Sequence, residues 1–145
     1  MPDKETLERA RRDKAQGKSP STQAGEFVRE EIEHIRHGKH GARSTKQAIA
    51  IGLSKARRAG VKLPPGGSRS SRRQARRDLS KSHSHKRPSP RRSRAVERAL
   101  EREPHRTASR AALSRQARSA ARRRPKAARK AAARKAARTR KAHQR

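Results

Sequence analysis

The chain has no cysteine, tryptophan or tyrosine, and Phe27 is its only residue of the Phe, Tyr and Trp group. Without cysteine, disulfides and thiol catalysis are excluded. With one aromatic residue, the chain lacks the stacking platforms that bind single-stranded nucleic acid. Acidic residues are scarce as well, because 12 Asp and Glu face 44 Lys and Arg, for a formal net charge of +32. This imbalance is typical of proteins whose partner is a polyanion.

Large apolar side chains are few after residue 63, where only Leu79, Val96, Leu100 and Leu113 occur. Ordering the backbone costs about 1–2 kcal/mol per residue, and burying a leucine returns roughly 1.5–3 kcal/mol. Residues 64–145 are therefore predicted not to build a core. No apolar segment is long enough to be a signal peptide or a membrane span. We expect a cytoplasmic protein.

Two amphipathic helices are predicted in the first half of the chain. The first runs over about 21–37, and an apolar stripe at Ala24, Phe27, Val28, Ile32 and Ile35 follows its 3.6-residue period. The second runs over about 45–59, begins at the capping box Ser44-Thr-Lys-Gln47 and ends before Pro64-Pro65. Its small residues, spaced four apart, favour close approach of another backbone: Ala48, Gly52 and Ala56.

The fold class predicted from these patterns is all-α, a small helical hairpin followed by a largely disordered basic tail with conditional helices. Residues 1–18 form a polar helical extension, and residues 19–63 form the hairpin. Residues 64–93, rich in Arg, Ser and Pro, are a disordered linker. Residues 94–145, rich in Ala, Arg and Lys, are disordered or become helical when bound.

The segment from Pro104 to Arg145 contains sixteen Lys or Arg and no Asp or Glu. Each cation that replaces a condensed counterion on DNA adds salt-dependent affinity, so this segment predicts nucleic-acid binding. No constellation of Asn, Gln and Arg suggests readout of base edges, and no nucleophile or phosphate loop suggests an enzyme. The residues predicted to contact phosphates are Arg91, Arg92, Arg122, Arg123, Arg124, Lys126, Arg129, Lys130, Arg134, Lys135, Arg138 and Lys141.

Two resemblances accompany these patterns. Two sequences in the region 18–63 resemble an uncharacterised bacterial family of unknown function, whose members are often labelled DNA-binding: Ser19-Pro-Ser-Thr-Gln-Ala-Gly-Glu-Phe-Val28 and Ser44-Thr-Lys-Gln-Ala-Ile-Ala-Ile-Gly-Leu-Ser-Lys-Ala-Arg-Arg-Ala-Gly60. That resemblance implies a compact helical module followed by a variable basic tail. The tail, with Ser89-Pro-Arg-Arg92, is similar to the tails of linker histones and bacterial histone-like proteins. In such tails a turn presents two cations to the minor groove.

The favoured function is non-sequence-specific DNA binding by a histone-like, nucleoid-associated protein that neutralises phosphates. One alternative is an RNA-binding or ribosome-associated protein, since an arginine-rich segment that folds on RNA has the same composition. Another is a protein-interaction module with a solubilising basic tail. Separately from the choice of function, residues 19–63 are a candidate homodimer interface. The helix at 45–59 is interpreted as a solvated basic face rather than a recognition helix.

Histidines occur at His34, His37 and His40, and again at His83 and His85. Histidines at these spacings can bind a metal ion, but ordinary solvated side chains are favoured because no cysteine accompanies them. No metal, cofactor, membrane partner or small-molecule substrate is predicted.

Overall fold

The structure is a computed structural model that describes residues 1–84 and 86–144. These residues form seven α-helices and one 3₁₀ helix, η1, with no strand among them. The chain divides into two compact units, residues 1–109 and residues 110–145. The helices are α1 (Lys4–Ala15), α2 (Pro20–Arg36), α3 (Thr45–Arg58), α4 (Arg69–Lys81), α5 (Pro90–Glu101), η1 (His105–Ala108), α6 (Arg110–Arg122) and α7 (Lys126–His143).

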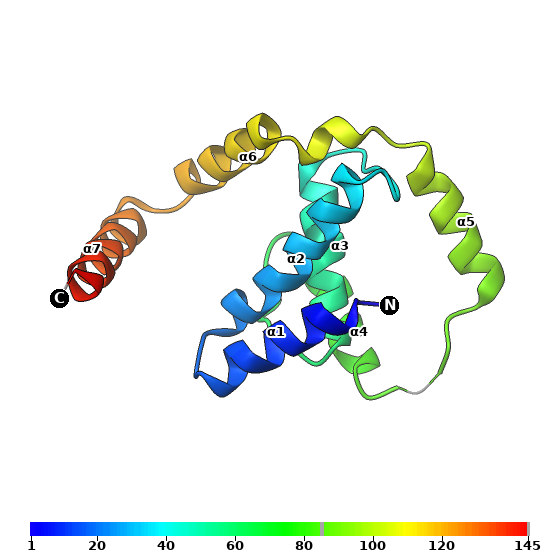
Figure 1. The fold of residues 1–145 in the computed structure, drawn as a ribbon, viewed down its shortest axis with the longest axis horizontal. Coiled ribbons are helices and arrows are strands. Elements are labelled where there is room, and N and C mark those ends of the chain that lie inside the picture. The colour runs from blue at the N-terminus through cyan, green and yellow to red at the C-terminus, as the bar shows by residue number, and fades with distance from the viewer. Residues whose placement is uncertain (85, 145) are drawn as a thin grey trace. The chain divides into compact units, whose positions relative to one another are not determined.

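The centre of the first unit is the antiparallel pair α2 and α3, which lie side by side (Figure 1). The sequence predicted both helices and the close approach between them. Ala48 and Ala56 are fully buried, and Gly52 lies so near α2 that an added Cβ would be 2.6 Å from the Val28 Cα. On α2, Phe27 and Ile35 are buried as expected from the apolar stripe. The capping box is formed in part, because the backbone N–H of Gln47 donates to Ser44 Oγ at 3.1 Å.

Helix α1 packs on α2 and adds to the core rather than fraying as a polar extension. Ala10 joins the apolar cluster around Phe27, with Leu7 partly buried beside it. The Arg9 Nε donates to Glu26 Oε2 at 2.6 Å, and this hydrogen bond raises the pKa of Arg9. The residues ahead of the predicted hairpin are therefore part of the same folded unit.

The prediction of a disordered linker at residues 64–93 is wrong, because Arg69–Lys81 form helix α4. It docks on α3 through Ala75 and Asp78, which are both almost fully buried. The Asp78 carboxylate accepts hydrogen bonds from Ser54 Oγ at 2.8 Å and from Arg58 Nε at 3.2 Å. A buried carboxylate that is paired in this way can hold a basic helix against the core without an apolar stripe.

Residues 100–108, here called the return segment, also pack against the first unit. The Gly41 N–H donates to the Leu100 carbonyl at 2.8 Å, and the Thr45 hydroxyl donates to the Thr107 carbonyl at 2.7 Å. Arg36 Nε donates to the carbonyl of Ala108, which is fully buried. The folded unit thus extends well beyond residue 63, because backbone carbonyls provide the attachment that apolar side chains do not.

The prediction of a largely disordered tail is wrong, because residues 110–122 and 126–143 form the helices α6 and α7. Neither helix has a buried residue. The prediction assumed that a segment without a core stays disordered. An α-helix, however, satisfies its backbone hydrogen bonds internally, and alanine and arginine have high helix propensity. No helix within residues 1–84 and 86–144 is both long and apolar enough to cross a membrane.

Gly41 is expected to be essential for docking the return segment. An added methyl group would overlap the Glu103 carbonyl, so Gly41→Ala should displace this segment and lower stability by about 1–3 kcal/mol. Faster amide exchange at Gly41 and Ala42, together with a lower thermal midpoint, is the expected result. Gly66→Ala is the matched control, since nothing lies within 4 Å of its added Cβ. Equal amide exchange rates in Gly41→Ala and Gly66→Ala would contradict the role of Gly41 in docking the return segment.

Candidate nucleic-acid interface

The second unit is a dense and uncompensated cationic surface. Residues 110–145 contain fifteen Lys or Arg and no Asp or Glu. Apart from Arg145, which lies outside the described residues, all of these basic residues are exposed. No carboxylate within the unit can neutralise them, so each is available to an external anion.

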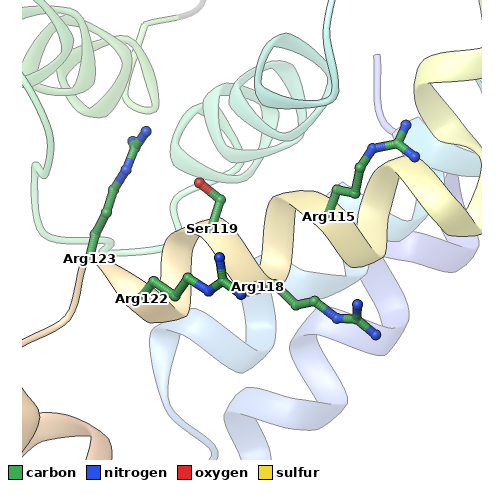
Figure 2. A pocket seen from close by; sticks show the side chains of 5 residues that line it. All are labelled: Arg115, Arg118, Ser119, Arg122 and Arg123. Carbon is green, nitrogen blue, oxygen red and sulfur yellow. The ribbon is translucent and has the colours of Figure 1, made fainter.

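Helix α6 gathers part of this charge on one face. Residues 115, 118, 119, 122 and 123 recur at intervals of three and four, which places them on adjacent turns of one helix surface. Together they line a shallow hollow of about 350 Å³. Figure 2 shows the arginine side chains projecting from successive turns, with the Ser119 hydroxyl between them. Guanidinium groups and a hydroxyl are the donors that phosphate oxygens accept best.

Helix α7 continues the pattern with a different spacing. Lys126, Lys130, Arg134 and Arg138 follow one another every four residues and form a basic ridge on an otherwise alanine-rich helix. Like charges four residues apart destabilise an isolated helix by about 0.2–0.5 kcal/mol per pair. A bound polyanion would remove this repulsion, so binding and helix stability reinforce each other.

The residues predicted to contact phosphates lie in three places: the start of α5, the connection between α6 and α7, and the helices α6 and α7 themselves. Arg91 and Arg92 lie in the first turn of α5, where Ser89 is the N-cap and Pro90 the first helical residue. The Ser-Pro-Arg-Arg sequence therefore begins a helix instead of forming an isolated turn. Arg123 and Arg124 connect α6 to α7, and the other predicted residues lie at the end of α6 or on α7, all of them exposed: Arg122, Lys126, Arg129, Lys130, Arg134, Lys135, Arg138 and Lys141.

Sequence reasoning missed two residues of the α6 face, Arg115 and Arg118. Both lie in a stretch where alanine and serine dilute the positive charge. The signal that identifies them is their spacing from Arg122, at minus seven and minus four, which places all three on one helical face.

Two of the four basic residues of α3 pair with acidic residues of the first unit. Lys55 Nζ lies 2.7 Å from Glu31 Oε2, and Arg58 pairs with Asp78. The Nε atom of Arg57 is buried and has no hydrogen-bond partner among the described residues. Only Lys46 is exposed and has no ion pair among the described residues. The expectation of a solvated basic face is therefore wrong for Lys55 and correct for Lys46. That α3 is not a recognition helix stays a prediction.

A group of acidic and histidine side chains lies near the carboxyl end of α2. Glu31, His34 and His40 each present one potential ligand atom within 4.8 Å of the others, and Asp3, Glu30 and His34 form a second such group. A hydrogen bond with His34 lowers the pKa of Asp3. The side chains of His34 and His40 are 14% and 17% exposed, so the expectation of solvated histidines is wrong for these two. It is correct for His37 and His83, which are exposed, and His85 lies outside the described residues.

Comparison with known proteins identifies one similarity. A family of unknown function, DUF6496, matches residues 11–67, which span the end of α1, the whole of α2 and α3, and the residues leading to α4. No curated protein and no solved structure matches the chain. The matched region is part of the folded first unit, and it ends before the cationic second unit begins.

Proposed function

We propose that the protein binds DNA without sequence specificity, as a histone-like, nucleoid-associated protein that acts by phosphate neutralisation. The observation that supports this proposal best is the second unit, where two helices carry exposed Lys and Arg with no acidic residue to pair with them. Such a surface gains affinity by releasing the counterions condensed on a duplex. The proposal assigns no catalytic step and no cofactor to the chain.

Both units would contribute to DNA binding, in different ways. The helices α6 and α7 supply most phosphate contacts, with Arg115 and Arg118 added to the residues predicted from sequence. The first unit supplies a stable folded domain whose exposed α5 cations, Arg91 and Arg92, add a smaller contribution. Lack of specificity follows from the same chemistry, because phosphate contacts position a protein on DNA but carry no base information.

The test is the salt dependence of binding to two unrelated duplexes of about 30 base pairs, measured by fluorescence anisotropy. If about eight phosphates are neutralised, log Kd should change with log salt concentration with a slope of roughly 7. Affinity should then fall by about 10³- to 10⁵-fold between 50 and 200 mM salt, and equally for both sequences. A slope near zero, or a strong preference for one duplex, would contradict the proposal.

A structured RNA hairpin, added as competitor at matched salt and matched nucleotide concentration, tests the choice of DNA. The proposal expects RNA to displace the duplex no better than unlabelled DNA does. Displacement by RNA at a tenfold lower concentration would favour an RNA-binding function instead. Dimerisation through residues 19–63 stays a prediction, which sedimentation of the full chain tests.

A further inference from the structure

We propose that Glu31, His34 and His40 form a binding site for a single divalent transition metal ion, with zinc as the most suitable probe. One ligand atom from each residue lies within 4.8 Å of the others. Two imidazoles and one carboxylate are a donor set that zinc accepts in three-ligand sites, with water in the fourth position. Magnesium and calcium are less suitable because they prefer oxygen ligands.

The Glu31 carboxylate is the first reason for this proposal. Its side chain is fully buried, and neither of its oxygens accepts a hydrogen bond of acceptable geometry within the described residues. Lys55 Nζ lies 2.7 Å from Oε2 and His40 Nε2 lies 3.3 Å from Oε1, so both neighbours are close but poorly aligned. Lys55 therefore pairs with Oε2, whereas Oε1 has only the imidazole of His40 beside it. A buried carboxylate oxygen without a hydrogen bond is costly, and a cation coordinated by Oε1 would lower that cost.

The geometry at His40 is the second reason. Its Nδ1 is 3.0 Å from the Gly41 carbonyl oxygen, to which it can only donate, so in the neutral ring Nε2 is the bare nitrogen that a metal binds. Metal-bound histidines characteristically donate their other N–H to a carbonyl or carboxylate in this way. Two ligands that are each about 2.0–2.1 Å from a tetrahedral zinc ion are about 3.3 Å apart. That is the separation between His40 Nε2 and Glu31 Oε1.

The surrounding charge also favours a divalent cation. Three carboxylates meet here, those of Asp3, Glu30 and Glu31, and Lys55 is the cation that contacts two of them. The charge of Lys39 acts on Asp3 as well. With both histidines neutral, the three carboxylates, Lys55 and Lys39 sum to −1. Lys55 lies toward Oε2 of Glu31, whereas Oε1 faces His40, so the lysine and a metal would occupy opposite sides of the carboxylate.

The site would connect two parts of the first unit. Glu31 and His34 lie one turn apart on α2, and His40 lies in the connection to α3, immediately before Gly41 and its hydrogen bond to the return segment. A bound metal would therefore fix that connection against α2. Metal affinity would then appear as folding stability, since the unfolded chain does not hold the three ligands together.

The experiment is a titration of the full-length, chelator-treated protein with Zn²⁺, followed by calorimetry and by NMR of the imidazole resonances. We expect one equivalent to bind, with shifts at His34 and His40 but not at His37, and a higher thermal midpoint. His40→Asn should weaken binding by at least about 10-fold and abolish the thermal shift. His37→Asn is the matched control, because His37 is exposed on the same helix end and lies outside the cluster.

Co²⁺ provides a second measurement that needs no substitution. Replacing zinc with cobalt in the unmodified protein should give the intense visible absorption of a four-coordinate site, which His37→Asn leaves unchanged. Absence of a one-to-one complex in the unmodified protein would overturn the proposal. Equal zinc affinity in His40→Asn and in His37→Asn would overturn it as well.

Discussion

Removing residues 110–145 is expected to lower affinity for duplex DNA by roughly 10⁴-fold at 150 mM salt, because about five or six of about eight phosphate contacts would be lost and each removes about 0.9 from the salt slope. The truncation point follows from the structure. A cut at residue 104 would also remove Ala108 and the Thr107 carbonyl, which hold the return segment on the first unit. A cut after Ser109 leaves that attachment in place.

Two measurements separate loss of contacts from loss of folding. The truncated chain should retain the thermal midpoint of the full chain, because α6 and α7 bury no residue. Its salt slope should fall to that of the contacts left in the first unit. If the truncated chain bound the duplex as tightly as the full chain at every salt concentration, the second unit would not be the interface.

A finer variant tests the α6 face by itself. Arg115→Gln, Arg118→Gln and Arg122→Gln together remove three charges from one helical surface while keeping residues of high helix propensity. The expected decrease in the salt slope is about 2 to 3. Its matched control is the same triple substitution at Arg72, Arg73 and Arg76, on the exposed side of α4. A larger decrease in the control would place the interface on the first unit.

The helices that sequence predicted best are those where local and tertiary signals agree. The apolar period and the Ser44–Gln47 cap specified α2 and α3 to within one or two residues. The period of small residues also indicated the contact at Gly52, because a stripe of Ala and Gly on one helix face lets the backbone of another helix pack closely against it. In these elements, the pattern and the packing have the same physical cause.

The parts that sequence did not predict are stabilised by interactions with no period. Helix α4 depends on the buried carboxylate Asp78, a single acidic residue in an arginine-rich segment. The return segment depends on its own carbonyls, which every sequence possesses. The grouping of Glu31, His34 and His40 depends on how the connection after α2 folds back. Their sequence spacing alone is equally compatible with solvated side chains.

The predicted phosphate contacts illustrate the difference between composition and placement. Composition predicted seven basic residues of α7 as phosphate contacts, because a prediction from exposed charge requires no tertiary information. It did not identify Arg115 and Arg118, since a face defined by three- and four-residue intervals becomes visible only when the segment is treated as a helix. A segment expected to be helical only when bound gives no reason to group Arg115 and Arg118 with Arg122.

Gly52→Ala is expected to destabilise the first unit by about 1–3 kcal/mol, the usual cost of overpacking a close contact. In an exposed helix the same change would stabilise by up to about 1 kcal/mol, because alanine has the higher helix propensity. Here the added Cβ would lie 2.6 Å from the Val28 Cα and 3.0 Å from the Phe27 carbonyl oxygen. Both are backbone atoms of α2, so relief requires the two helices to move apart.

The matched control is Gly25→Ala on α2, where nothing lies within 4 Å of an added Cβ. Urea unfolding of both variants, with the same probe and protein concentration, should show opposite signs: a lower midpoint for Gly52→Ala and an equal or higher one for Gly25→Ala. Since the contact at Gly52 sets the spacing between α2 and α3, its loss should also disturb Glu31 and Lys55 on opposite sides of that interface. Zinc affinity should therefore weaken in Gly52→Ala but not in Gly25→Ala. A stabilised Gly52→Ala would show that α3 does not pack against the α2 backbone at this point.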